Sequence, residues 1–170
     1  IKDSSANKTG VICSSFEIIA SLLLSDEEFL SIKDRYVEEV IVLLRQKASA
    51  EVNLLFREYR HNSGEKTLVE LSTRISHDIN EITDLLLDDF SKKKDSILED
   101  EIFKNILLRY CPEVLREKFG DYISQLPSSH VVAILAASIG STIVYNEGLG
   151  WLKTVGQNEK LRAIMTYIRH

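Results

Sequence analysis

Cysteine and proline are scarce in this chain, which has two of each among 170 residues. Cys13 and Cys111 cannot build a spaced disulfide framework, so we expect reduced thiols in a cytosol-like compartment, either cytoplasmic or mitochondrial. Runs of alternating polar and apolar residues are also missing, which removes the usual signal for β-strands. The sequence therefore predicts a mainly α, bundle-like chain that is almost wholly helical.

A basic excess is absent as well. The net charge of −5 favours solubility and argues against a nucleic-acid surface. The most apolar stretch, residues 131–144, is too short for a membrane span, which needs roughly 20 apolar residues. We therefore expect no nucleic acid and no membrane as partners. We predict instead a buried core helix over residues 131–144. Two rows of small residues on it are expected to let neighbouring helices approach closely: Ala133, Ala137 and Ser141 form one row, and Ala136 and Gly140 form the other.

Three kinds of chemical motif are not found. No Gly-x-Gly-x-x-Gly follows a predicted strand, so the nucleotide fingerprint is missing. The four histidines lie far apart and form no metal-ligand pattern. No general base is placed beside Cys13, which argues against a nucleophile there. We therefore predict no catalytic residue and no metal site within these residues.

Helical periodicity dominates what is present. Apolar residues recur every three or four positions from Asp26 to Tyr59, which predicts one long amphipathic helix and leaves a break near residues 47–50 open. Such a helix is either a packing helix in a bundle or a long strut. A loop at residues 61–65 follows, and then Thr67 and Glu70, at the spacing of a capping box, predict the start of a second amphipathic helix.

The first residues carry the only motif that points to a ligand. A small polar loop is expected to run through Asn7 and Gly10 into Val11, and Ser14 with Ser15 is expected to open an apolar helix. Hydroxyl groups at a helix start cap free backbone N–H groups, and the same end attracts anions. This pattern is typical either of an anion-binding loop or of a simple capped turn.

The order of these residues resembles a known family. Asn7 to Glu17 reads Asn-x-x-Gly-Val-x-x-Ser-x-x-Glu, which is similar to a segment of glutamate dehydrogenases, and residues 2–8 look more specifically like the large, eukaryotic-type NAD-dependent enzymes. Residues 29–151 also look like the helical C-terminal part of that class. The chain begins at Ile1 without a leader pattern or a methionine, so we expect a piece of a longer polypeptide.

The resemblance implies a division of the chain and roles for four residues. Residues 1–25 would be the end of a dinucleotide-binding catalytic domain, and residues 26–170 a helical C-terminal region. Val11 and Ser14 would contact the substrate, with Ser14 bonded to its side-chain carboxylate. The cofactor-binding residues would be Asn7 and Gly10.

The reaction that the resemblance implies is oxidative deamination of L-glutamate to 2-oxoglutarate and ammonia, with NAD as the cofactor. The catalytic residues of the family precede this segment, so the isolated chain is expected to be inactive. The parent enzyme is expected to be a homo-oligomer. The alternative is a non-enzymatic helical interaction or regulatory module, in which the long helix binds a partner.

Overall fold

The computed structural model describes residues 8–169, without the side chains of residues 8–11 and 157. No strand occurs in this part of the chain, and the prediction of a mainly α fold is confirmed. The α-helices are α2 (Lys8–Leu23), α3 (Asp26–His61), α4 (Leu68–Lys92), α5 (Lys94–Glu99), α6 (Glu101–Tyr110), α7 (Glu113–Phe119), α8 (Ser128–Glu147) and α9 (Lys160–Arg169). Three 3₁₀ turns, η1 (Gly120–Gln125), η2 (Trp151–Thr154) and η3 (Gln157–Glu159), connect the later helices.

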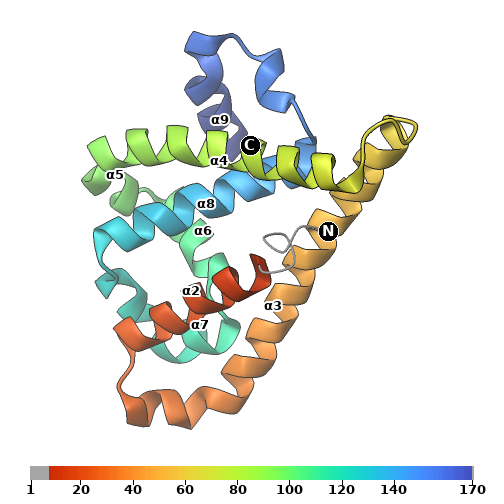
Figure 1. The fold of residues 1–170 in the computed structure, drawn as a ribbon. Coiled ribbons are helices and arrows are strands. Elements are labelled where there is room, and N and C mark those ends of the chain that lie inside the picture. The colour runs from red at the N-terminus through yellow and green to blue at the C-terminus, as the bar shows by residue number, and fades with distance from the viewer. Residues whose placement is uncertain (1–7, 170) are drawn as a thin grey trace.

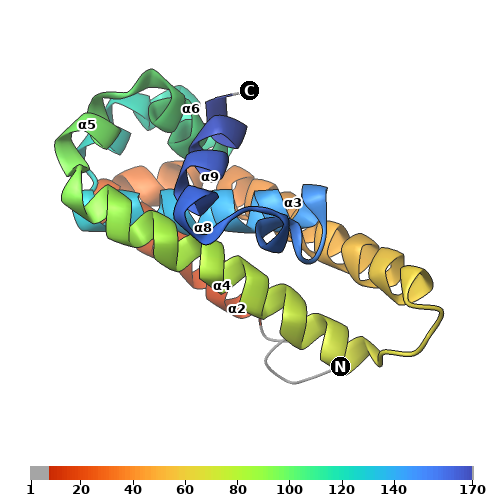
Figure 2. The ribbon, with the colours of Figure 1, turned by 90° about the horizontal axis from the view of Figure 1, so that it is seen from above.

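Helices α4 and α8 lie side by side at the centre of the fold, and α3 runs diagonally along one side of them (Figure 1, Figure 2). Helix α8 is long and apolar enough to cross a membrane by length and composition, the only such helix in the part of the chain that the structure describes. The apolar composition of α8 is explained by its position in the core, where most of its apolar side chains are buried. The residues that it buries are Val131, Val132, Ile134, Leu135, Ala136, Ile139, Gly140, Ile143 and Val144.

Capping boxes open the two longest helices. The Ser25 hydroxyl accepts from the backbone N–H of Glu28, whose carboxylate accepts from the Ser25 backbone N–H at 2.8 Å. Thr67 and Glu70 repeat this reciprocal pair at the start of α4, as the sequence predicts. Each box satisfies two N–H groups that the helix itself cannot pair. Helix α3 then continues without a break to His61 and contacts α2, α4, α7 and α8, as a packing helix does.

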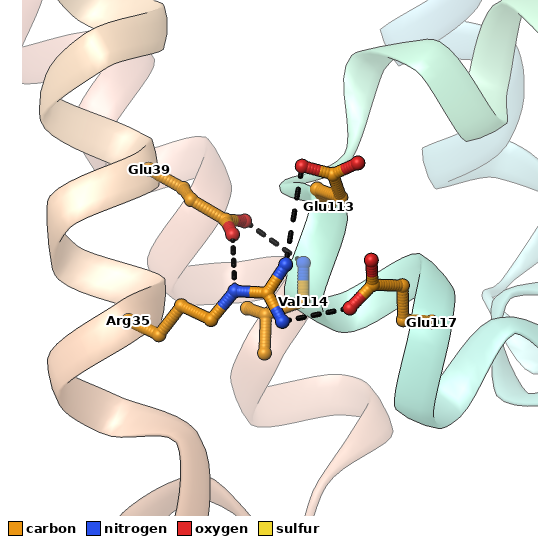
Figure 3. Close-up of polar contacts among 5 residues, drawn as sticks. All are labelled: Arg35, Glu39, Glu113, Val114 and Glu117. Atoms are coloured by element: carbon orange, nitrogen blue, oxygen red, sulfur yellow. Dashed lines mark hydrogen bonds and ion pairs between the residues drawn. The ribbon is translucent and has the colours of Figure 1, made fainter.

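An ionic network joins α3 to the short helix α7 (Figure 3). The Arg35 guanidinium donates to Glu39 of its own helix and to Glu117 of α7, both at 2.7 Å. This bond from Arg35 is the main reason why the pKa of Glu117 lies below its ordinary value. The second oxygen of Glu39 accepts from the backbone N–H of Val114 at 2.8 Å, and so caps α7 from outside. Pro112, at the N-cap of α7, forms no side-chain cap of its own.

Gly140 lies where α8 packs on α4, as its row of small residues predicts. Ala133 and Ala137 of the other row are exposed, so the prediction of close packing is wrong for them. A Cβ atom at this position would lie 2.7 Å from Thr83 Oγ1 and 3.2 Å from the carbonyl oxygen of Ile79. Replacing Gly140 with leucine should therefore overpack the contact and lower the free energy of unfolding by about 1–3 kcal/mol. Urea denaturation measures this change. Gly120→Ala is the control, because its Cβ would meet no atom within 4 Å; equal stability of the two variants would contradict the close contact.

Candidate functional site

From Lys8 onward, the N-terminal motif lies inside a helix. Helix α2 begins at Lys8, so Gly10, Val11 and Ser14 are helical, and the prediction that a loop extends to Val11 is wrong. The hydroxyl of Ser15 does not cap the helix start; it donates back to the carbonyl of Ile12 at 2.9 Å, as serines within helices do. Asn7 falls outside the described residues, as does the side chain of Val11.

Ser14 lies on the outer face of α2 and is exposed. Residues four apart share one face of a helix, so Gly10, Ser14, Ile18 and Leu22 form a single line along α2. Two members of this line are large and apolar, and the exposed fractions of Ile18 and Leu22 are 42% and 47%. The outer face of α2 therefore carries the Ser14 side chain at the start of an exposed apolar strip.

The inner face of α2 is firmly attached to the rest of the fold. Phe16 is fully buried and stacks on Tyr110 with ring centroids 5.1 Å apart. Its carbonyl accepts from the hydroxyl of Tyr36 at 2.7 Å. The hydroxyl groups of Ser15 and Tyr110 are hydrogen-bonded at 2.5 Å. These contacts fix the rotation of α2 about its axis, and so they keep Ser14 outward while its neighbour Ser15 points inward.

A groove of about 470 Å³ runs between α2 and α3 beside the outer face. Cys13 borders it, and its thiol donates to Glu17 Oε1 at 3.8 Å. Burial and the nearby Glu17 carboxylate raise the pKa of Cys13 above its ordinary value. The thiol is therefore protonated at neutral pH, which does not favour nucleophilic chemistry.

One group of potential metal ligands was missed by the sequence reasoning. His77, Asp78 and Glu81 of α4 place ligand atoms within 4.8 Å of one another. Protein groups engage one oxygen of each carboxylate: Asp78 Oδ2 accepts from the backbone N–H of Gly150 at 2.9 Å, and Glu81 Oε1 pairs with Lys160 at 2.6 Å. These bonds attach the C-terminal segment to α4, which gives the two acids a structural explanation.

Lys47 is a further residue that the sequence reasoning missed. It follows Val40, Leu43 and Leu44 at helical spacing, on the stripe of α3 that faces the core. A lysine on a core-facing stripe is the feature of the sequence that could have identified this residue. Its ammonium group lies 5.1 Å from the centroid of the Tyr110 ring, and burial lowers its pKa from the ordinary value.

Curated relatives match most of the chain. Glutamate dehydrogenase 2 of Dictyostelium discoideum is 30% identical over 162 residues and covers 87% of this chain. The NAD-specific glutamate dehydrogenase of Saccharomyces cerevisiae is 29% identical over 164 residues, also covering 87%. A probable NAD-specific glutamate dehydrogenase of Schizosaccharomyces pombe is 30% identical over 159 residues and covers 85%.

The chain spans only 14–15% of the length of these relatives. No family model matches the chain, and no solved structure matches it. The resemblance that the residues from Asn7 to Glu17 indicate is nevertheless confirmed by these matches over most of the chain. Over most of its length this chain is similar to one segment of the eukaryotic NAD-specific glutamate dehydrogenases.

Proposed function

We propose that this chain acts as part of an NAD-dependent glutamate dehydrogenase, which oxidises L-glutamate to 2-oxoglutarate and ammonia. The observation that carries the proposal is the similarity to enzymes of that name over 87% of the chain. NAD, when bound, accepts the hydride from the substrate. The residues of this chain would position the substrate and cofactor, while the catalytic groups would come from other parts of the enzyme.

In this proposal the first helix ends the catalytic domain. Residues 1–25 belong to the dinucleotide-binding domain, and residues 26–170 form the helical region that supports it. The first turn of a helix has backbone N–H groups without helical partners, and Gly10 and Val11 lie in the first turn of α2. Gly10 has no side chain to hinder a cofactor, and Asn7 precedes it by three residues.

Ser14 would recognise the side-chain carboxylate of glutamate. A serine hydroxyl donates one hydrogen bond, and a bond to a charged acceptor is stronger than one to a neutral group. Its exposure on the outer face of α2 supports this role, since the helix itself does not cover the residue. Val11 lies three residues earlier on nearly the same face and would pack against the aliphatic part of the substrate.

The apolar strip behind Ser14 gives the rest of the enzyme a surface to cover. Ile18 and Leu22 are large, apolar and about half exposed. The relatives are several times longer than this chain, so most of such an enzyme lies outside it. The catalytic part would pack against this strip and bring the substrate to Ser14. Subunit contacts of a homo-oligomeric parent enzyme would then involve the helical region.

The test is NADH formation from L-glutamate and NAD, measured by absorbance with the full-length polypeptide and with the 170-residue chain alone. We expect activity from the first and none from the second, because the family's catalytic residues precede this segment. A reaction without glutamate is the control. A full-length polypeptide that forms no NADH would overturn the proposal and favour a helical interaction module. Activity of the chain alone would refute the division of roles.

A further inference from the structure

A second cleft lies on the inner side of α2, away from Ser14. It has a volume of about 600 Å³ and is bordered by residues of α2, α3, α4, α6 and α8. Its walls are mainly apolar, with Ile79 of α4 and Ala133, Ile134 and Ala137 of α8 among them. A size of several hundred Å³ and apolar walls with a few polar groups are typical of small-molecule sites.

Among the described residues that line the cleft, Lys47 carries the one ammonium group. Among the side chains that the structure describes (residues 12–156 and 158–169), no carboxylate forms an ion pair with Lys47. Lys92, Lys93, Lys104 and Lys160, in contrast, each lie within 2.7 Å of a carboxylate. Removing an ammonium group from water is costly unless an anion accompanies it. Lys47 therefore gives the cleft a charge that an anionic ligand would balance.

Several polar groups next to Lys47 are already hydrogen-bonded to one another or to Glu51. The Tyr110 hydroxyl is bonded to Ser15, and the Tyr145 hydroxyl donates to Glu51 Oε2 at 3.3 Å. The Glu51 carboxylate, one turn beyond Lys47, is thereby held by Tyr145. Asn80 and His130 supply further polar atoms in the same walls. One positive charge among apolar surfaces suits a ligand with one negative charge, because a second charge would be left without a partner.

We propose that this cleft binds a small monocarboxylate with an apolar body. The carboxylate pairs with the Lys47 ammonium group, and the hydrocarbon part lies against Ala133 and Ala137 of α8. The inference does not depend on the proposed dehydrogenase activity, because none of these residues belongs to the outer face of α2.

The probes are octanoate, octan-1-ol and octylammonium, which share a chain length and differ in charge. Calorimetric titration of each into the full-length polypeptide should show one octanoate bound per chain. Octan-1-ol should bind at least about tenfold more weakly, since its hydroxyl group carries no negative charge to pair with the Lys47 ammonium group. Octylammonium should not bind, because its charge has the same sign as that of Lys47.

Two substitutions test the position of the ligand. Lys47→Met removes the charge and should weaken octanoate binding by about tenfold or more, whereas Lys47→Arg should keep it. Ala137→Leu fills the cleft from an exposed position and should abolish binding without lowering the melting temperature. Lys33→Met and Ala48→Leu are the matched controls, because both residues are exposed on α3 outside these walls.

Three results would overturn the proposal. One is wild-type affinity for octanoate in Lys47→Met, and another is equal affinity of the wild type for octanoate and octan-1-ol. The third is no binding by the full-length polypeptide, which would indicate that another part of the protein fills the cleft. If Ala137→Leu proves unstable, the Lys47→Met and Lys47→Arg pair still decides the outcome.

Discussion

Replacing Phe16 with alanine is expected to lower the free energy of unfolding by about 3–5 kcal/mol. The ring is fully buried and stacks on Tyr110, so its removal leaves a cavity between α2 and α6. The bond from the Tyr36 hydroxyl is made to the backbone of residue 16, and the substitution does not remove its acceptor. The loss therefore measures how strongly packing of one side chain holds α2 in place. Urea denaturation of the 170-residue chain is the measurement.

Ile18→Ala is the matched control for Phe16→Ala. Ile18 lies half a turn along the same helix but is 42% exposed. Its truncation should cost well under the value for a buried side chain, because little cavity is created. Equal losses in the two variants would contradict the assignment of inner and outer faces, and with it the outward direction of Ser14.

Replacing Ser14 with alanine in the full-length polypeptide is expected to lower kcat/KM for glutamate by about ten- to a hundredfold. The substitution removes a hydrogen bond to a charged group, worth about 1.5–3 kcal/mol, and a factor of ten corresponds to about 1.4 kcal/mol. The KM for NAD should change little, since the proposed bond is made to the substrate alone. Initial rates of NADH formation at varied glutamate and NAD concentrations measure both effects.

Ser21→Ala controls for the loss of a hydroxyl group from α2. Ser21 is exposed, and its hydroxyl donates to the carbonyl of Ile18 at 2.9 Å within the helix. Its removal should leave the glutamate kinetics unchanged. If Ser14→Ala also leaves them unchanged, the assignment of Ser14 to substrate recognition fails, even where the polypeptide proves to be an active dehydrogenase.

Local chemistry explains which parts of the fold could be predicted. Ser25 with Glu28, and Thr67 with Glu70, satisfy helix N–H groups within four residues, so their effect is visible in the sequence. The start of α2 was misplaced because a serine forms an N-cap or bonds back along a helix, and Ser15 does the latter. The Ser15 hydroxyl is also hydrogen-bonded to that of Tyr110, a contact across 95 positions that the local sequence does not reveal.

The two candidate sites could likewise be predicted from the sequence only in part. The motif residues could be identified from their order alone, but the outward direction of Ser14 depends on the packing of Phe16 between α2 and its neighbours. The cleft around Lys47 could not be predicted, because its walls come from five helices that are distant in sequence. A lysine on a core-facing stripe is visible in the sequence, yet its lack of a nearby carboxylate among the described residues is a property of the assembled fold.

The bond from Val114 to Glu39 makes the order of α7 depend on another helix. A helix of seven residues is too short to persist in water alone, and here the carboxylate that completes its first turn belongs to α3. Solvent protection of the Val114 amide is therefore a joint property of two segments separated by more than seventy positions. When α3 and α7 separate, the Val114 amide loses its hydrogen bond to Glu39 and exchanges with solvent. Hydrogen exchange at this one amide therefore reports whether the two helices are in contact.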